Sequence, residues 1–454
     1  MDLAIIGAGY VGLVTGVCLA EKGHRVTCVD LDAERVVRIN RGEPPIFEAG
    51  LEPLLKRHVG DRFRATTDLA SAVREAQLTM IAVGTPFDGK QIDLRYIREA
   101  TQQVGEALRE TDGYHLVVIK STVVPGTTQD VVRPLLAESS GKTHGRGFGV
   151  AMNPEFLSEG VAIRDFMEPD RIVLGCDDKQ GLAMLHELYA PFDPAVPRVE
   201  TNPGTAEMIK YASNALFATL ISYANEIAGL CSSLGGIDAA RVMQGLHLAG
   251  GFRMQSDGRI ALPGSAEPDA QVARITSFLE AGCGFGGSCL PKDVSALAAH
   301  GRAHGRAMPL LDAVLGINRE QPTEMLQLLR RRFDTLTGLS VAVLGLAFKP
   351  GTDDVRLSPA LPLIELLHAE GAKLTLYDPL VTADADPRFG PPAHFAADLE
   401  DALAEQDAVM IVTRWDDFTA IPELVADHVH PPVVIDGRRI LAPDAVPAYE
   451  GIGL

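Results

Sequence analysis

The sequence predicts an α/β fold with a Rossmann-type unit at each end and a helical region between them. Two apolar runs, at residues 2–6 and from Ser340, each break into a glycine-containing turn. Between them, a long apolar stretch beginning at Pro203 is compatible with one continuous helix. A chain of 454 residues is too long for a single core. We therefore expect three domains, over residues 1–202, 203–325 and 326–454.

The first glycine turn has the layout of a dinucleotide site. Gly7, Gly9 and Gly12 follow the apolar run, a helix-compatible stretch comes next, and a second apolar run ends at Asp30. In such a unit the glycines permit a tight turn, close approach of a pyrophosphate and close packing of helix on strand. The helix N-terminus offers free N–H groups to the phosphates. Asp30 would bind the ribose 2′-hydroxyl and repel a 2′-phosphate, which predicts NAD and not NADP.

Apolar runs alternate with helix-like stretches through the first 200 residues. Polar residues stand where two of these runs end, at 83–86 and 120–123. Because ligands bind at the carboxyl ends of strands in doubly wound sheets, both segments are expected at the cofactor site. Strands are expected at 2–6, 25–29, 78–83, 115–120, 148–151 and 171–175.

The middle of the chain is predicted to be helical. The long helix begins at Pro203, with Thr205 or Asn202 as its cap, and has Lys210 and Asn214 on one face because they are four residues apart. It is too apolar for one domain to cover, which favours dimerisation through this region. Further helices are expected up to about residue 247 and over 292–330, a loop over 250–264, and strands within 340–349, 374–378, 408–413 and 433–436.

Composition and charge exclude several classes of partner. Hydrophobic residues make up 46% of the chain and charged residues 22%, as in globular proteins. The net charge of −19 disfavours nucleic acid and anionic membranes. The apolar run 215–234 contains Asn225 and Glu226, which indicates a buried helix and not a membrane span.

The start of the chain and its cysteines bear on its location. The chain opens with a strand, which leaves no room for a signal peptide. Its six cysteines lack regular spacing, which argues against a disulfide framework. No histidine or cysteine cluster has the spacing of metal ligands. We expect a cytoplasmic protein without a metal site.

The segment 283–293 carries the strongest chemical signal. Cys289 ends a glycine-rich turn there and is followed by Lys292 and Asp293. Glycines let the backbone approach a ligand closely, and an accessible thiolate is a nucleophile. The segment therefore predicts a nucleophilic Cys289. The other cysteines, including Cys283 in the same segment, are expected to be inert.

Taken in order, these motifs resemble those of the UDP-glucose/GDP-mannose dehydrogenase family, over nearly the whole chain. They are Gly-Ala-Gly-Tyr-Val-Gly at 7–12, Val-Gly-Thr-Pro at 83–86, Ser-Thr-Val at 121–123, Asn-Pro-Glu-Phe-Leu-Ser-Glu-Gly at 153–160, the Lys210…Asn214 helix, Gly-Phe-Gly-Gly-Ser-Cys-Leu-Pro-Lys-Asp at 284–293, and Phe348-Lys349…Arg356.

The resemblance implies a four-electron oxidation of a nucleotide sugar by two NAD, from the C6 alcohol to the carboxylate. The leading reaction is UDP-glucose to UDP-glucuronate, a precursor for polysaccharide biosynthesis. GDP-mannose or a UDP-N-acetylhexosamine is the alternative substrate. A non-catalytic NAD-binding sensor would leave the catalytic residues unexplained, and an acyl-transfer enzyme would leave the dinucleotide motif unexplained.

The family's chemistry implies a role for each catalytic residue. The first oxidation is assigned to three side chains around a water: Lys210, Asn214 and Asp293. Cys289 would attack the aldehyde, and hydride loss from the thiohemiacetal would leave a thioester. Water would then hydrolyse the thioester, with Glu155 as base and Thr122 positioning the water.

The resemblance also implies two sets of contacts, in which Lys349 and Arg438 would bind the phosphates and carbohydrate. Cofactor contacts are expected at Gly7, Gly9, Tyr10, Val11, Gly12, Asp30, Arg35, Thr85, Thr122, Glu159, Lys292 and Arg356. Substrate contacts are expected at Phe156, Leu157, Ser158, Glu159, Lys210, Asn214, Phe278, Leu279, Glu280, Ala281, Gly282, Gly286, Phe348, Lys349 and Arg438.

The segment 249–273 departs from the family's pattern because it is longer than the loop that many members carry. In the family, an arginine near this point can reach the sugar site of a neighbouring subunit. Arg253, Arg259 and Arg274 are the candidates for that role. Since the segment is expected beside the sugar, the choice of sugar stays open. The resemblance also implies a homodimer or a higher homo-oligomer.

Overall fold

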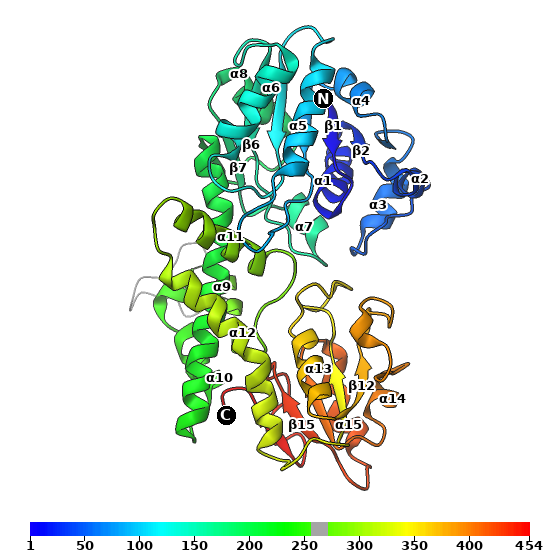
Figure 1. Ribbon diagram of the computed structural model, residues 1–454, viewed down its shortest axis with the longest axis vertical. Coiled ribbons are helices and arrows are strands. Elements are labelled where there is room, and N and C mark those ends of the chain that lie inside the picture. The colour runs from blue at the N-terminus through cyan, green and yellow to red at the C-terminus, as the bar shows by residue number, and fades with distance from the viewer. Residues whose placement is uncertain (256–270) are drawn as a thin grey trace. The chain divides into compact units, whose positions relative to one another are not determined.

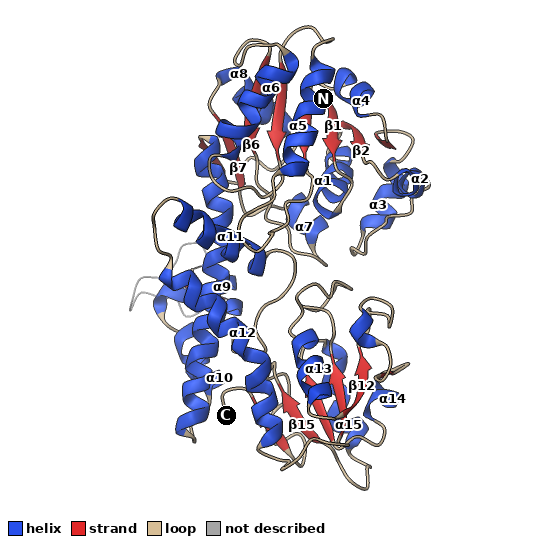
Figure 2. Cartoon of the chain, viewed as in Figure 1, coloured by secondary structure: helices blue, strands red, loops and turns tan. Residues whose placement is uncertain are grey.

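The computed structural model describes residues 1–255 and 271–454. Contacts divide the chain into two compact units, Met1–Ser213 and Asn214–Leu454. Each unit has its own sheet with helices packed against it (Figures 1 and 2). The predicted α/β fold with a long central helix is confirmed. The division into three domains stays a prediction.

The first unit is built on an eight-stranded sheet in the order β3-β2-β1-β4-β5-β6-β7-β8. Neighbouring strands are parallel except β6 and β7, which are antiparallel. The inner strands β4, β5 and β6 are buried along their whole length, which explains their continuous apolar runs. The strands are β1 (Asp2–Ile6), β2 (Arg25–Val29), β3 (Phe63–Thr66), β4 (Leu78–Ile81), β5 (His115–Ile119), β6 (Phe148–Met152), β7 (Ile172–Cys176) and β8 (Arg198–Thr201).

Helices cover both faces of this sheet because successive strand side chains point to opposite sides. One face packs mainly on α1, α3, α7 and α8, and the other on α4, α5 and α6. The helices are α1 (Tyr10–Glu21), α2 (Ala33–Asn40), α3 (Leu51–His58), α4 (Leu69–Glu75), α5 (Arg95–Leu108), the π-helix η1 (Thr128–Val132), α6 (Arg133–Ser140), α7 (Ala162–Met167) and α8 (Lys179–Leu188).

The strand order reverses between β1 and β4. Ile6, the last residue of β1, is level with Val29 of β2 and Ile81 of β4. The turns that follow these three strands therefore emerge at the same edge of the sheet. A reversal of this kind leaves a crevice outside the carboxyl ends of the strands, where ligands bind in doubly wound folds.

The second unit contains a six-stranded parallel sheet in the order β13-β12-β11-β14-β15-β16. Its two faces pack on α12 and α13, and on α14 and α15. The strands are β11 (Ser340–Leu344), β12 (Lys373–Tyr377), β13 (His394–Phe395), β14 (Ala408–Ile411), β15 (Val433–Asp436) and β16 (Tyr449–Gly451), and a separate antiparallel pair is formed by β9 (Arg253–Met254) and β10 (Gln271–Val272).

The helices of the second unit include those that carry the cysteine loop. The α-helices are α10 (Ala239–His247), α11 (Leu290–Ala303), α12 (Pro309–Arg330), α13 (Ala360–Ala369), α14 (Leu399–Leu403) and α15 (Ile421–Val425). Short 3-10 helices are η2 (Gly250–Phe252), η3 (Arg274–Phe278), η4 (Pro387–Phe389) and η5 (Asp416–Ala420).

The long helix α9 runs from Pro203 to Leu234 and crosses the division between the units; it is green in Figure 1. Asn202 is its cap, because its Oδ1 accepts a hydrogen bond from the N–H of Thr205 at 2.8 Å. By length and composition, α9 is apolar enough to cross a membrane, a test that core helices also pass. Asn225 is buried within it and Glu226 is exposed, so the predicted burial of this helix holds for only part of its surface.

Candidate functional site

The glycine turn after β1 is tightly closed. Gly7 has a φ of +103°, and its N–H donates to the carbonyl of Val29 at 2.7 Å. A β-carbon on Gly12 would stand 1.8 Å from the carbonyl oxygen of Gly7. Both positions therefore require glycine. The result is the strand–turn–helix geometry that cradles a pyrophosphate.

The N-terminus of α1 leaves room for a ligand. Gly9 is the N-cap, and no described atom beyond its immediate surroundings lies within 4 Å of where its β-carbon would stand. Among the described side chains, none caps α1. The first N–H groups and the positive end of the helix dipole are thus available to phosphate oxygens. These residues fit the pyrophosphate of NAD.

Asp30 follows β2 beside this turn. One carboxylate oxygen accepts a hydrogen bond from the N–H of Ala8 at 2.9 Å, and the other accepts one from the N–H of Asp32 at 3.0 Å. Arg35 forms an ion pair with Asp30 at 3.1 Å. The carboxylate is therefore held at the position where dinucleotide-binding sheets bind the ribose hydroxyls.

Two glycine substitutions distinguish the contribution of this turn to stability from its contribution to NAD binding. Gly9→Ala adds a methyl group where the protein leaves room, so we expect the melting temperature to shift by only about 2 °C. We expect NAD binding to weaken by about tenfold or more, because the methyl group occupies the space of the pyrophosphate. Calorimetric titration with NAD and thermal unfolding measure the two effects.

Gly12→Ala is the matched variant for this pair. Its β-carbon overlaps the Gly7 carbonyl, so we expect the melting temperature to fall by about 4 °C or more. An unchanged NAD affinity in Gly9→Ala would show that the pyrophosphate binds elsewhere.

A buried ion pair joins the loop after β6 to α9. Lys210 Nζ lies 2.9 Å from Glu155 Oε1, and the two side chains are 4% and 6% exposed. Glu155 Oε2 also accepts a hydrogen bond from the N–H of Leu157 at 2.6 Å. Burial raises the pKa of Glu155, but Lys210, the Leu157 N–H and Lys120 together outweigh burial and hold it below its ordinary value. Glu155 is therefore a carboxylate at neutral pH, as a general base must be.

Lys120 and Asn153 fix the start of the loop that carries Glu155. Lys120 Nζ donates to Asn153 Oδ1 at 2.8 Å, and the Tyr189 hydroxyl donates to the same oxygen at 2.5 Å. Asn153 Nδ2 donates to the carbonyl of Val173 at 2.8 Å. Burial lowers the pKa of Lys120 to about 8. The ends of β5, β6 and β7 are tied together by this network.

The residues after Glu155 are also held by named contacts. The Phe156 ring lies 3.9 Å from the Arg171 guanidinium and 5.5 Å from Lys210 Nζ, in cation–π geometry. The N–H of Ser158 donates to Asp165 Oδ2 at 3.0 Å. The sugar and cofactor contacts expected of residues 156–159 stay predictions.

The loop that carries Thr122 is held by Thr85, which was predicted as a site residue, and by Glu207, which was not. Thr85 Oγ1 donates to the carbonyl of Thr122 at 2.8 Å, which links the loops after β4 and β5. Farther along, Glu207 accepts from the N–H of Gly126 at 2.6 Å and from the N–H and hydroxyl of Thr128 at 2.8 and 2.6 Å. Burial raises the pKa of Glu207 to about 7, although these donors oppose the shift. Glu207 thus ties this loop to α9, one turn before the lysine of the ion pair.

In the second unit, Cys289 is the N-cap of α11 and is exposed. A helix N-terminus favours the thiolate, the nucleophilic form. One turn on, Asp293 is 1% exposed, and its Oδ2 accepts a hydrogen bond from Asn214 Nδ2 at 2.6 Å. Lys292 Nζ contacts Asp293 Oδ1 at 2.5 Å. Lys292 is therefore paired with Asp293, and the expected contact of Lys292 with the cofactor stays a prediction.

Four of the other cysteines are poor nucleophiles. Burial raises the pKa of Cys18 and Cys28 to about 12 and that of Cys176 and Cys283 to about 11. All six cysteines are free thiols, and Cys289 is the only exposed one of the six. Reactivity toward an electrophile should therefore concentrate on Cys289.

Three side chains from distant parts of the sequence hold the cysteine loop. Asn318 on α12 accepts from the N–H of Phe285 at 2.7 Å and donates to its carbonyl at 2.9 Å. Asn225 on α9 accepts from the N–H of Gly282 at 2.7 Å. Arg438 donates to the carbonyl of Gly284 at 3.2 Å. The two asparagines were not predicted, because a single amide within a helix has no local signature.

The cysteine loop packs against the loop after β11. A β-carbon on Gly286 would stand 2.3 Å from the carbonyl oxygen of Leu357, and one on Gly287 would stand 2.7 Å from the Phe348 ring. The N–H of Gly287 donates to the carbonyl of Arg356 at 2.8 Å. The expected contact residues Gly286, Phe348 and Arg356 therefore do lie together in this unit.

Two other expected residues of the second unit make different contacts. Phe278 stacks on Phe217 with centroids 4.3 Å apart, and Glu280 pairs with Arg414 at 2.8 Å. Three arginines were candidates for a sugar contact: Arg253 lies in β9, Arg274 is exposed at the start of η3, and Arg259 lies outside the described residues.

The second sheet repeats the glycine turn with an acid that is more fully hydrogen-bonded. Gly345 after β11 has a φ of +88°, and Asp378 follows β12 as Asp30 follows β2. Asp378 is 4% exposed and accepts from the N–H groups of Leu346, Ala347, Leu380 and Val381 and from the Trp415 indole, at 2.8–3.2 Å. Asp378 thus accepts five hydrogen bonds, whereas Asp30 accepts two backbone hydrogen bonds and pairs with Arg35, so the acid of the second sheet is more fully occupied.

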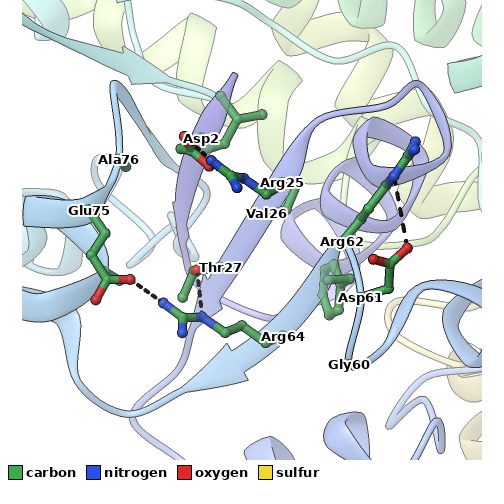
Figure 3. Close-up of a pocket in the computed structure, with 13 residues that line it drawn as sticks. Asp2, Arg25, Val26, Thr27, Gly60, Asp61, Arg62, Arg64, Glu75 and Ala76 are labelled. Atoms are coloured by element: carbon green, nitrogen blue, oxygen red, sulfur yellow. Dashed lines mark hydrogen bonds and ion pairs between the residues drawn. The ribbon is translucent and has the colours of Figure 1, made fainter.

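A separate hollow of about 440 Å³ lies beside the starts of β1, β2 and β3. Its arginines are paired with neighbouring acids, as Figure 3 shows for Arg25 with Asp2 and for Arg64 with Glu75. The hollow lies at the opposite ends of these strands from the glycine turn. It is not part of the candidate site.

Within residues 1–255 and 271–454, no three His, Cys, Asp or Glu side chains are gathered as a metal site requires.

The catalytic candidates therefore form two groups. The first unit holds Thr122, Glu155 and Lys210, and the second holds Asn214, Cys289 and Asp293. Lys210 and Asn214 are one turn apart on α9, so the helix carries a member of each group. The first group contains a hydroxyl, a carboxylate and an ammonium, and the second contains a thiol, a carboxylate and an amide.

Comparison with known proteins relates all three regions to one family. The NAD binding domain of the UDP-glucose/GDP-mannose dehydrogenase family matches residues 1–193, its central domain matches 204–268 and 269–320, and its UDP binding domain matches 342–443. The UDP-glucose 6-dehydrogenase AglM of Haloferax volcanii is 46% identical over 97% of this chain and 97% of its own.

Solved structures give the same relationship. A UDP-glucose dehydrogenase from Pyrobaculum islandicum is 38% identical, with a TM-score of 0.87 over 99% of this chain and 97% of its own. A UDP-D-ManNAc dehydrogenase from Pyrococcus horikoshii is 28% identical, with a TM-score of 0.83 over 100% and 99%.

Proposed function

The chain belongs to the UDP-glucose/GDP-mannose dehydrogenase family, and we propose that it oxidises UDP-glucose to UDP-glucuronate. It is an NAD-dependent oxidoreductase, and NAD bound at the glycine turn would supply the hydride acceptor for both oxidations. The observation that carries the proposal is the exposed Cys289 at the start of α11, one turn from a buried Asn214–Asp293 pair. A dehydrogenase that stops at an aldehyde needs no such thiol.

In the first oxidation the C6 hydroxyl loses a proton and a hydride. We assign the proton to Asp293, through a water, because its buried carboxylate is held by Asn214 and Lys292. Lys210 and Asn214 would stabilise the alkoxide as its charge develops. The product is the aldehyde, still bound to the enzyme.

In the second oxidation the Cys289 thiolate attacks the aldehyde carbon. Loss of a hydride from the thiohemiacetal leaves a thioester, and water attack on the thioester releases the carboxylate and restores the thiol. Glu155 is ionised and would take the proton from that water. Thr122 would position the water. The covalent bond explains why the aldehyde is not released.

The second sheet is proposed to bind the nucleotide of the sugar. The family match calls this region a UDP binding domain, and Asp378 is occupied, which argues against a dinucleotide there. Lys349 and Arg438 are the proposed partners of the phosphates and sugar. In this assignment residues 1–202 bind NAD, 203–325 carry the cysteine loop and the dimer contact, and 326–454 bind UDP.

The test is a panel of nucleotide sugars assayed for NADH. We expect two NADH per UDP-glucose, with UDP-glucuronate identified by mass spectrometry. A higher rate with UDP-N-acetylmannosamine or GDP-mannose would reassign the substrate. NAD binding without NADH from any sugar would overturn the enzymatic proposal.

We also propose that α9 forms the centre of a homodimer. Leu216, Tyr223 and Leu230 are 48%, 44% and 55% exposed and are spaced seven residues apart, so they form one apolar stripe with Leu234. An apolar stripe of this length on a long helix is typical of a protein interface.

Leu230→Glu tests the dimer. An unpaired carboxylate buried in an apolar contact costs roughly 3 kcal/mol, which corresponds to a roughly 100-fold weaker dimer. Light scattering after size exclusion should show a shift toward monomer at micromolar concentration. Gln327→Glu, on the exposed face of α12, adds the same charge as a control. A dimer of equal strength in both variants would remove α9 from the interface.

The proposed location is the cytoplasm. The six free thiols are compatible with a reducing compartment.

A further inference from the structure

Glu48 is a buried carboxylate outside every motif discussed above. It lies in the connection between α2 and α3 and is 6% exposed. Its oxygens accept hydrogen bonds from the Tyr10 hydroxyl, from the N–H of Gly160 at 2.6 Å and from the N–H of Ala162 at 2.8 Å. A buried carboxylate with three donors is a strong local constraint, because charge-assisted bonds are stronger than neutral ones.

The Glu48 contacts join two parts of the candidate site. Tyr10 is the first residue of α1, directly after Gly9 in the glycine turn. Gly160 ends the loop that begins at Asn153 and carries Glu155, and Ala162 begins α7. Burial and the Glu48 carboxylate raise the pKa of Tyr10, so its hydroxyl stays protonated and donates. One carboxylate therefore contacts both the cofactor turn and the loop of the proposed base.

The loop 153–160 is anchored at both ends. Asn153 is held at its start by Lys120 and Tyr189. Val161, the N-cap of α7, makes no side-chain capping bond, and Glu48 supplies the acceptor that this helix start lacks. Without Glu48, the N–H groups of Gly160 and Ala162 at the far end of the loop would both lose their acceptor.

We propose that Glu48 is a positioning residue that holds the Glu155 loop against the glycine turn, so that thioester hydrolysis and NAD binding both depend on it. The proposal rests on the proposed function, because Glu155 is the hydrolytic base there. Only a carboxylate accepts from all three donors. The amide of Glu48→Gln would turn an NH₂ group toward at least one of them.

The experiment compares three full-length variants with the wild type. Glu48→Gln removes the acceptor charge. Tyr10→Phe removes only the contact to the glycine turn. Glu52→Gln, an exposed glutamate paired with Lys56 on the neighbouring α3, is the control. Each variant is mixed with UDP-glucose and NAD, and the reaction is quenched at steady state. Mass spectrometry of the intact protein then measures the fraction that carries an adduct on Cys289. NAD affinity is measured without sugar by calorimetry.

We expect Glu48→Gln to turn over about 10-fold to 100-fold more slowly and to accumulate the thioester. Hydroxylamine, which cleaves a thioester to a hydroxamate and the free thiol, should restore much of the NADH rate. NAD should bind several-fold more weakly. Tyr10→Phe should weaken NAD binding to a similar extent with a smaller adduct, and Glu52→Gln should match the wild type.

A Glu48→Gln protein with wild-type turnover and adduct overturns the proposal. Slow turnover without adduct or hydroxylamine rescue also overturns it, because that pattern marks a residue needed only for folding. If Glu48→Gln does not fold, Tyr10→Phe decides: adduct and NAD affinity equal to the wild type reject the proposal, and a change in both supports it. Failure of the proposed function is separate, since it appears as wild-type protein that makes no NADH from UDP-glucose.

Discussion

Cys289→Ala is expected to abolish formation of the acid, with turnover falling on the order of 10³-fold or more. Without the thiol there is no thiohemiacetal, so the second hydride has no tetrahedral adduct to leave from. The first oxidation uses other groups. Rapid-quench analysis should therefore find at most one NADH per sugar and no covalent adduct.

Cys283→Ala is the control in the same segment. Cys283 is 2% exposed, with its sulfur 3.4 Å from the carbonyl oxygen of Gly437. Its loss should cost about 1 kcal/mol of stability through a small cavity, with acid formation retained. In the native protein, iodoacetamide should label Cys289 first, and substrate should protect it. Acid formation by Cys289→Ala at the rate of Cys283→Ala would refute the covalent mechanism.

Lys210→Met is expected to lower the free energy of unfolding at neutral pH by about 3–5 kcal/mol and to remove activity. It leaves the Glu155 carboxylate buried without its partner, and an uncompensated buried charge is costly. Chemical denaturation measures the stability. The double variant Lys210→Met/Glu155→Gln removes both charges and should recover most of the loss, because neither remaining group is ionised.

The same pair sets a pH dependence whose sign differs between variants. In the wild type the pKa of Glu155 lies below its ordinary value of 4.5, so the pair's stabilisation is present above that pH and is lost as the pH falls through the folded pKa. In Lys210→Met, burial dominates and should raise this pKa, so stability should increase as the pH is lowered from 7 toward 4.5. Equal pH slopes in the two proteins would show that the pair is not coupled as described.

The inner strands of both sheets were predictable from the local pattern of apolar residues, and the edge strands were not. Every expected strand is present, and each is an inner strand of its sheet. Strands β3, β8, β13 and β16 were not predicted, and all four are edge strands. An inner strand is covered on both faces and shows as an apolar run. An edge strand such as β8 is half exposed, so its sequence, Arg-Val-Glu-Thr, carries no such run.

Site residues were predictable where the chemistry is written in contiguous sequence. Gly7, Gly9 and Asp30 belong to one strand–turn–helix–strand unit, and Cys289 lies in one glycine-rich loop. Glu48, Glu207 and Asn318 were not predicted. Each contacts a backbone group 33 or more residues away, and nothing adjacent in the sequence marks it.

The sequence by itself determined the reactive groups of this protein: a dinucleotide turn, a nucleophilic cysteine, and the polar residues that match one enzyme family. Their chemistry depends on residue type and on short spacings, and both can be read directly from the sequence. Only the tertiary structure decided what holds them, because the pairing of Lys210 with Glu155 and the contacts of Glu48 depend on distant segments packed together. These contacts also set the protonation state of Glu155, because Lys210, the N–H of Leu157 and Lys120 together outweigh burial and keep the carboxyl ionised.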